Sequence, residues 1–216
     1  MKLYSYCVKH DSGAAPNPFW GICTLVICKP AIRRTANIRD WIVGLGSKNS
    51  PDKDISDCVV YAMQVTEKMS LEDYDNFCKE FLPNKIPNKR SRDYRLHVGD
   101  CIYDYSSEPF PKLRWSVHTE ENRNTDLSGE FALLSKNFYY FGGKPIKLPK
   151  ELKPIIHQTQ GHKSDANFPY IRKFIEWLEN SGYEKNKLVG NPQLKKEFQK
   201  FSELQLKCSR IDLEDE

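Results

Sequence analysis

The sequence lacks the features that mark membrane, secreted and repeat proteins. No apolar run of about 18 residues occurs in its 216 residues, so no segment is predicted to span a membrane. The first residues, MKLYSYCVKHD, alternate like a strand and contain no apolar stretch of a signal peptide. Internal repeats and low-complexity tracts are also missing. We therefore expect a globular protein of the cytoplasm.

Disulfide and metal-binding patterns are missing as well. The seven cysteines stand singly at positions 7, 23, 28, 58, 78, 101 and 208, without a C-x-x-C pair. Cys23 and Cys28 have no histidine near them, and His157 and His162 have no third ligand at a regular spacing, so we expect no metal. No cofactor fingerprint is predicted either. We interpret the cysteines as small buried apolar residues in a reducing compartment.

The composition predicts a packed core under a polar surface. Hydrophobic residues make up 39% and aromatic residues 12% of the chain, while the mean hydropathy is −0.66. The formal net charge of +4 is typical of an ordinary solvated surface. One segment, NKIPNKRSRDYR at residues 84–95, is strongly basic and predicts a surface loop whose Lys89, Arg90 and Arg92 contact phosphate.

Alternating and periodic apolar residues predict a mixed α/β fold. Strands are expected over residues 3–8, 21–28, 41–45, 59–65 and 130–135. Helices are expected over residues 71–81, with Ser70 as N-cap, over 165–181, with Phe168, Ile171, Phe174, Ile175 and Leu178 on one face, and over 194–206. The runs at 41–45 and 59–65 should be antiparallel neighbours. We expect a domain over residues 1–150 and a helical extension, packed on it, over 151–216.

A small-residue corner, Gly44-Leu45-Gly46-Ser47, ends the first of those two runs. Glycine lets a backbone approach a ligand closely, and Ser47 and Lys48 add a hydroxyl and a cation. As a cofactor fingerprint the corner is weak, because no helix pattern follows it. The order of strand, corner and strand over residues 38–74 resembles small PUA, ASCH and EVE-type β-barrels that bind bases, which is a likeness of fold alone.

A wider resemblance is carried by segments spread over roughly residues 1–150: LYSYCVKHDSGAAPNPFWGICTLVICKPAIRR, RDWIVGLGSKNS, VVYAMQVTEKMSLEDY, GDCIYDY, WSVHTEEN and ALLSKNFYYFGGKPIKLP. Taken in series, they resemble the Nmad2 family of bacteria and phages, the nucleotide modification associated domain 2 proteins. The chain departs from the family at Arg39-Asp40, where the family carries Gly-Asp. The strand order, with the likeness over residues 38–74, predicts a PUA-like mixed β-barrel with peripheral helices. The resemblance to the Nmad2 family implies an association with DNA modification or phage-defence systems.

The loop that follows the first predicted strand offers one set of base-binding candidates. Aromatic rings can stack on a base while short polar side chains bond its edge. The candidates are His10, as a catalytic group, and Asp11, Ser12, Asn17 and Trp20, as base-binding groups. The alternative is a surface turn capped by Asp11 and Ser12, with Trp20 in the core.

A second set surrounds His118 in the segment Trp115-Ser116-Val117-His118. Ser116 and His118 fall on one side of a strand and Trp115 on the other, so the segment can bind a ligand or transfer a proton. Asp100 or Asp126 could orient His118, and no Gly-x-Ser-x-Gly elbow accompanies Ser116. A purely structural histidine is the alternative.

A third set is the aromatic run Phe138-Tyr139-Tyr140-Phe141, where Tyr140 is a candidate for base stacking and Lys144 for a phosphate contact. A core strand explains the same run equally well.

These observations favour a protein that recognises modified bases or nucleotides in DNA. An enzyme that acts on a nucleotide or modified base through His118 and an acidic partner, Asp11, Asp100 or Asp126, is the alternative. In a further interpretation the protein docks a partner through the helix over 165–181.

Overall fold

A computed structural model describes residues 1–50 and 53–194 of the chain. Among these residues, the largest sheet has five strands. Its order begins β1 (Leu3–Cys7), β3 (Trp41–Leu45) and β4 (Cys58–Gln64), and both β9 (Phe138–Tyr140) and β10 (Ile146–Lys147) pair with β4. β1 and β3 are parallel, whereas β4 is antiparallel to its neighbours. The predicted antiparallel pairing of residues 41–45 with 59–65 is confirmed.

A second sheet lies beside the first. It consists of β2 (Cys23–Leu25), β8 (Phe131–Ser135) and β5 (Glu67–Ser70), in that spatial order. A short antiparallel pair, β6 (Tyr103–Asp104) and β7 (Lys112–Leu113), completes the strands described. The mixed α/β class is confirmed. The described strands form separate sheets rather than a closed barrel, so the PUA-like barrel is not confirmed.

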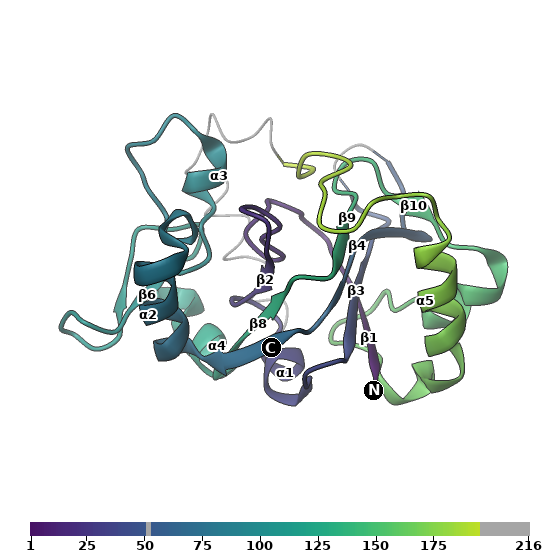
Figure 1. Cartoon of the computed structure of the whole chain (residues 1–216), viewed down its shortest axis with the longest axis horizontal. Helices are drawn as coiled ribbons and strands as arrows, with labels where there is room; N and C mark the ends of the chain where they lie inside the picture. Colours follow the sequence, from purple (N-terminus) through teal and green to yellow (C-terminus); the bar gives the residue numbers. More distant parts are fainter. Residues whose placement is uncertain (51–52, 195–216) are drawn as a thin grey trace.

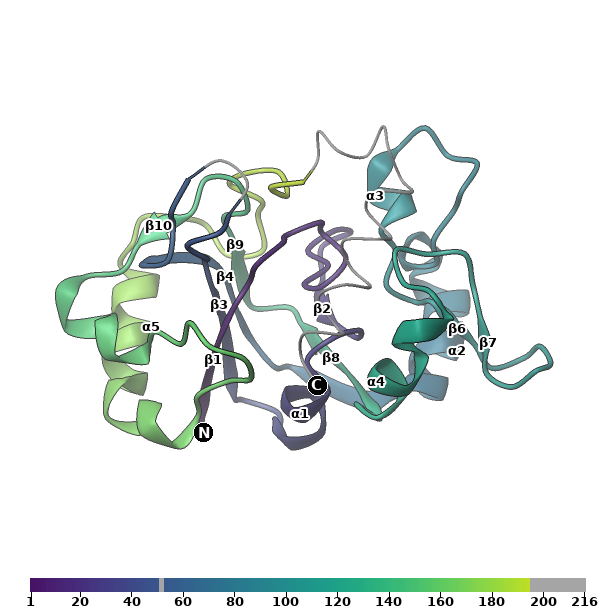
Figure 2. The same cartoon turned by 180° about the vertical axis from the view of Figure 1, so that it is seen from behind.

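Helices cover the two ends of this arrangement. α2 (Leu71–Phe81), α3 (Tyr94–His97) and β6 gather at one end, and α5 (Ile171–Glu179) lies at the other (Figures 1 and 2). Ser70 caps α2 as predicted, since its hydroxyl accepts the Asp73 N–H at 3.0 Å. Within the described residues, no helix is both long and apolar enough to cross a membrane.

Short helices fill the remaining connections. α1 (Pro30–Thr35) follows β2, and α4 (Arg123–Leu127) follows the single turn η2 (Glu120–Asn122). The other turns are η1 (Pro83–Lys85), η3 (Lys150–Ile155) and η4 (Asp165–Tyr170). α1 contacts both β8 and α4, so the chain segments around residues 30, 125 and 132 are packed together.

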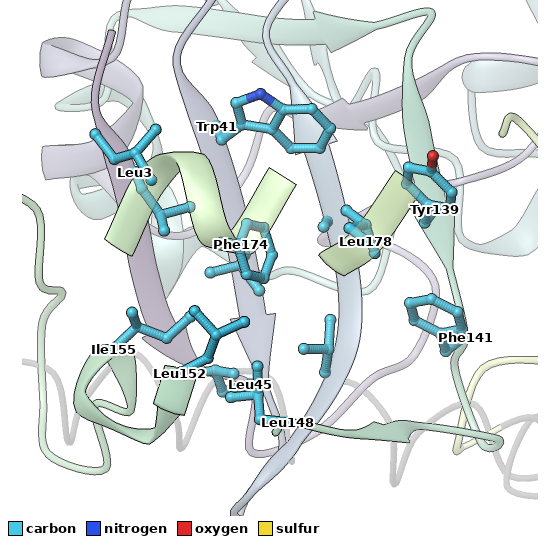
Figure 3. Close-up of a cluster of buried hydrophobic side chains, with 14 residues drawn as sticks. Leu3, Trp41, Leu45, Tyr139, Phe141, Leu148, Leu152, Ile155, Phe174 and Leu178 are labelled. Atoms are coloured by element: carbon cyan, nitrogen blue, oxygen red, sulfur yellow. The ribbon is translucent and has the colours of Figure 1, made fainter. Parts of the chain in front are cut away.

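One hydrophobic core lies between the large sheet and α5. Figure 3 shows Phe174 and Leu178 of α5 facing Trp41 and Leu45 of β3. The residues just after position 150 join the same core, because Leu152 and Ile155 are fully buried there. The division of the chain at residue 150 therefore stays a prediction, although a continuous core crosses it.

The predicted helix over 165–181 differs from the observed one at its start. Residues 165–170 form a 3₁₀ turn, and the α-helix begins only at Ile171, because Pro169 has no N–H to donate. Phe168 was expected on the apolar face but is 74% exposed, so that assignment was wrong. The helix predicted over 194–206 lies outside the described residues, apart from Leu194.

The glycines of the small-residue corner serve packing. A Cβ at Gly44 would overlap the ring of Tyr61, and one at Gly46 would overlap the Ile55 carbonyl oxygen. The hydroxyl of Ser47 accepts the Asn49 N–H at 3.1 Å and so closes the turn. The expected approach of a ligand to this corner finds no support, because the protein's own core occupies the space.

Candidate active site

A pocket opens where the end of β1, the turn between β2 and α1, and the segment before η2 come together. It has a volume of about 60 Å³. Residues from four chain segments line it: Tyr6, Cys7, Val8, Lys9, His10, Ser12, Ala14, Ala15, Ile27, Cys28, Lys29, Val117, His118, Thr159, Gln160 and Gly161. Of these, Thr159, Gln160 and Gly161 are exposed and form its outer rim. The pocket thus joins a polar, basic mouth to an apolar interior.

Cys28 occupies a sharp turn on the wall of this pocket. Its φ is 58° and that of Lys29 is 44°, so two successive non-glycine residues adopt the left-handed region. Such a conformation costs of order 1–3 kcal/mol per residue and persists only where the surroundings impose it. The Cys28 N–H donates to Asp126 Oδ1 at 3.0 Å, and its carbonyl oxygen accepts from Arg33 Nε at 2.9 Å. These two bonds fix the strained turn.

His118 lies against Cys28 and is held from behind by Asp126. Its Nδ1 is 2.6 Å from Asp126 Oδ2, and its Nε2 is 3.5 Å from Cys28 Sγ. The imidazole is 2% exposed and Asp126 is fully buried. Ser116 accepts the His118 N–H at 3.3 Å and donates to its carbonyl oxygen at 3.1 Å, which sets the local turn. A thiol, an imidazole and a carboxylate therefore stand in one line.

The charges of this line reinforce one another. Burial alone would lower the pKa of His118, but the Asp126 carboxylate and Cys28 raise that pKa well above 6.5. Burial alone would raise the pKa of Asp126, yet the charge and hydrogen bond of His118 hold it below 3.8. The pair therefore favours the imidazolium form of His118, in which Nδ1 donates to Asp126 and Nε2 donates to Cys28 Sγ.

Arg33 ties the parts of the site together. It is fully buried on α1, and its guanidinium donates to carbonyl oxygens of Val26, Cys28, Asp126 and Phe131. Burial lowers the pKa of Arg33, and the nearby Asp126 charge opposes that shift. One side chain thus fixes the end of β2, the Cys28 turn, α4 and β8 relative to one another.

Several residues predicted from the sequence meet at this site. His10, Ser12 and His118 line the pocket, and Asp126 orients His118 from behind it. Asp126 is the acidic partner that the structure selects among the three considered. The roles proposed for these side chains stay predictions, but their proximity is a structural fact.

Asp11 and Asp100, the other two acidic candidates, are bonded elsewhere. Asp11 accepts the Tyr140 hydroxyl at 2.6 Å. Burial raises its pKa to about 6, against the hydrogen bond of that tyrosine. Asp100 accepts from Tyr74 at 2.7 Å and from Thr24 at 2.5 Å. Tyr140, a candidate for base stacking, is fully buried in the core and does not line the pocket.

Other base-binding candidates serve structural roles away from the pocket. Asn17 is buried, donates to the Val98 carbonyl at 2.8 Å and accepts from Lys85 Nζ at 2.8 Å. Trp20 stacks under the Arg95 guanidinium, 4.5 Å from the ring centre. The structure does not bring these side chains, or Ser47, to the cavity that holds His118, because core bonding and turn geometry already fix them.

The basic candidates lie on the surface. Lys48, Lys89, Arg90 and Arg92 are all exposed. The ammonium of Lys89 is 6.0 Å from the centre of the Trp115 ring, so Trp115 belongs to the basic loop rather than to the pocket. Ser116 is buried and supports the backbone of His118, which differs from its predicted role as a ligand contact.

Cys28 is the functional residue that the sequence interpretation missed. The cysteines were expected to be buried, and Cys7, Cys23, Cys78 and Cys101 are. Cys28 and Cys58 are partly exposed, so the interpretation was wrong for these two, and Cys208 lies outside the described residues. Cys28 and His118 are 90 positions apart in the sequence, so no spacing rule predicts their contact. A cysteine with separate His and Asp residues in the chain was the available signal.

The fold and site define a mixed α/β protein with a cysteine–histidine–aspartate arrangement on a pocket wall. Across the described residues, no cluster of three or more His, Cys, Asp or Glu side chains is placed to hold a metal ion. The chain belongs to the Nmad2 family, described as nucleotide modification associated domain 2, whose profile matches residues 1–200. Searches of curated proteins and of solved structures gave no match. Family membership links the chain to nucleotide modification.

Proposed function

We propose that this protein is an enzyme that acts on a nucleotide or a modified base, with His118 as its acid–base group. The carrying observation is the 2.6 Å contact between His118 Nδ1 and Asp126 Oδ2, which fixes the imidazole while Nε2 faces the pocket wall at Cys28. A histidine oriented by a buried carboxylate is the arrangement that general acid–base catalysis requires. Nucleotide chemistry as the setting follows from the family.

The charge around the pocket suits an anionic substrate. Lys9 and Lys29 line it from two different chain segments, and His10 lies beside Lys9. The Lys29 ammonium is 5.3 Å from the centre of the ring of Tyr6, which also lines the pocket. Ammonium groups at a pocket mouth attract and position a phosphate. A nucleotide would therefore place its phosphate at the mouth and its reacting group at His118.

Conversion of defined substrates tests this proposal. DNA and mononucleotides, each with plain and modified cytosine and thymine, are incubated with the protein, and the nucleosides are quantified by mass spectrometry after digestion. We expect wild type to alter at least one modified substrate. His118→Gln should be slower by about 10²–10⁴-fold, the usual contribution of a general acid–base group.

His97→Gln is the matched control. His97 is half-buried on α3 and does not line the pocket, so its loss should leave the rate unchanged. Equal rates for His118→Gln and wild type, or no substrate altered by wild type, would refute the proposal.

A second candidate function is recognition of nucleic acid carrying modified bases, through the basic loop. Its supporting observation is the exposed trio Lys89, Arg90 and Arg92, with Lys89 above the half-buried Trp115 ring. Cations and an aromatic ring on one surface are the combination that binds phosphate and stacks a base. This function is compatible with the proposed enzymatic activity, because the basic loop can bind DNA while the reaction takes place in the pocket.

The salt dependence of binding tests this second function. Each phosphate contact contributes about −0.9 to the slope of log K against log salt on duplex DNA. Changing Lys89, Arg90 and Arg92 together to Gln should therefore reduce the slope by about 2–3.

The control removes the same charge elsewhere, by changing the exposed Lys147, Lys150 and Lys153 to Gln. If both triple variants keep the wild-type slope, the basic loop does not bind DNA. If plain and modified duplexes bind equally, recognition of the modification is refuted.

A further inference from the structure

We infer that Cys28 is a covalent nucleophile and that the substrate carries a small acyl group, as an amide or ester, attached to the nucleotide. This inference rests on the proposed function for the nucleotide part and on the site geometry for the chemistry. Sγ of Cys28, Nε2 of His118 and the Asp126 carboxylate form a continuous line of contacts of 3.5 and 2.6 Å. A thiol beside a histidine that a third group orients is the arrangement of an activated nucleophile.

The turn that carries Cys28 supports this role independently of the distances. Two successive residues with positive φ, Cys28 and Lys29, aim the thiol at the pocket instead of continuing β2. Backbone strain of this kind clusters at active sites, where the surroundings over-determine it. Here Asp126 both holds the Cys28 N–H and orients His118, so a single carboxylate sets nucleophile and base together.

The size of the pocket points to a substituent rather than a whole base. Its volume is about 60 Å³, less than half that of an engineered cavity of about 150 Å³ that takes up a benzene ring. A purine or pyrimidine therefore cannot enter completely, but an acyl group of a few atoms can. The rest of the nucleotide would stay at the rim, where Lys9 and Lys29 lie.

The reaction balances with water as co-reactant. The Cys28 thiolate attacks the carbonyl carbon, a C–S bond forms, and the C–N or C–O bond to the nucleotide breaks. His118 Nε2 gives its proton to the leaving nitrogen or oxygen. Water then attacks the thioester, His118 takes a proton from it, and the C–S bond breaks. The products are a carboxylic acid and the deacylated nucleotide, and Cys28 is regenerated.

The charged groups around Cys28 influence how the reactivity of its thiol depends on pH. Asp126 and Arg33 bond its backbone, and His118 contacts its sulfur. The lysines at the pocket mouth and His10 add positive charge at the same wall. Because an imidazolium and ammonium groups favour a thiolate over a thiol, we expect Cys28 to react at mildly acidic pH.

The first experiment compares Cys28 with Cys58 inside the wild-type protein. Both are partly exposed, but burial and the nearby Asp57 raise the pKa of Cys58 to about 11. The full chain is treated with iodoacetamide between pH 6 and 8, and each cysteine is quantified by fragment-resolved mass spectrometry. We expect Cys28 to react at least about tenfold faster at pH 6 and to change little with pH. Cys58 should accelerate about tenfold per pH unit, as a mostly protonated thiol does.

The second experiment follows acyl transfer with p-nitrophenyl acetate. Wild type should release several equivalents of p-nitrophenol and carry a transient acetyl thioester on Cys28. Cys28→Ala should lose this turnover by at least about 10²-fold, and the control Cys58→Ala should keep it. The labelling comparison needs no variant, so it remains decisive if Cys28→Ala does not fold.

Three results would overturn the inference: equal labelling of Cys28 and Cys58 at pH 6, turnover by Cys28→Ala equal to wild type, or no acetylation of Cys28. Neither assay uses a nucleotide. A negative result for Cys28 can therefore be distinguished from a failure of the proposed function on nucleotides. If the Cys28 assays fail but a nucleotide is converted, His118 acts as an acid–base group and Cys28 is not a nucleophile. If the Cys28 assays succeed but no nucleotide is altered, Cys28 is a nucleophile and the proposal of a nucleotide substrate is refuted.

Discussion

The substitution Asp126→Asn removes the charge that orients His118 while nearly preserving the shape of the side chain. Asp126 accepts three hydrogen bonds, from His118 Nδ1 at 2.6 Å, the Cys28 N–H at 3.0 Å and the Tyr103 hydroxyl at 3.2 Å. An asparagine has only one acceptor oxygen, so its NH₂ group would face either both the imidazole and the phenol, which share Oδ2, or the Cys28 N–H. Breaking a buried ion pair by removing one partner costs about 3–5 kcal/mol, and we expect a loss of this size near pH 6.5.

The dependence of stability on pH gives a sharper test than the loss itself. The folded-state pKa of His118 lies above its unfolded value of 6.5, because Asp126 and Cys28 outweigh burial, which alone would lower it. Its contribution to stability is therefore complete below pH 6.5 and is lost as pH rises toward the folded-state pKa. The loss is at most about 1.4 kcal/mol per pH unit, a slope reached only where the unfolded state has lost the proton and the folded state has kept it. In Asp126→Asn only Cys28 still opposes burial, so this decline should become shallower.

Urea unfolding of both proteins at pH 6.5, 7.5 and 8.5 measures these quantities. The difference in unfolding free energy between wild type and Asp126→Asn should shrink as pH rises, with similar m-values. Glu67→Gln is the control, since Glu67 forms an exposed ion pair with Lys136 worth about 0–1 kcal/mol and should leave the pH profile unchanged. Parallel profiles for wild type and Asp126→Asn would refute the account of the pair.

Further predictions concern backbone conformation and burial, and unfolding free energies check each of them. Arg39→Gly should stabilise the protein by about 0.5–1 kcal/mol, because Arg39 has a φ of 77°. Relief of this backbone strain gains about 1–2 kcal/mol, which exceeds the entropy cost of a glycine. A loss of stability would contradict this prediction. Gly129→Ala should cost about 1–3 kcal/mol, because its Cβ would overlap the buried Arg33 guanidinium. Gly143→Ala, whose nearest neighbour would be 3.4 Å away, should cost much less; equal costs would argue against the packing. Lys85→Met should cost about 3–5 kcal/mol of unfolding free energy, because the buried ammonium and its four hydrogen bonds are lost. A change below about 1 kcal/mol would contradict the stabilising role of these hydrogen bonds.

The elements that the sequence predicted well are those whose pattern is local. The helix at 71–81 has its capping serine and its apolar spacing within the twelve residues 70–81, and both are observed. The strands at 41–45 and 58–64 are continuous apolar runs, and their pairing follows from adjacency along the chain. The parallel pairing of β1 with β3 has no such local signal, because a stretch of 33 residues separates Cys7 from Trp41. Whether strands close into a barrel depends on such non-local pairings, and the predicted barrel is not confirmed by the separate sheets described.

The candidate site shows the same division. His118 and Asp126 are eight residues apart, and the sequence named both. Cys28 comes from a distant segment, and its exposure depends on a left-handed turn. The sequence does not predict this turn, because neither Cys28 nor Lys29 is a glycine. The aromatic and amide candidates were chosen by chemical type, which does not distinguish a ligand contact from a core bond such as that between Asn17 and Lys85. Arg39 adopts a φ of 77°, a conformation that glycine adopts more readily than arginine.

Nuclear magnetic resonance of the His118 imidazole, in ¹⁵N-histidine-labelled protein titrated from pH 5 to 9, measures the central pair directly. We predict a pKa well above 6.5, with protons on both ring nitrogens at neutral pH and the Nδ1 proton protected by Asp126. A neutral imidazole at pH 7, or a pKa below 6.5, would contradict the arrangement from which the proposed chemistry follows.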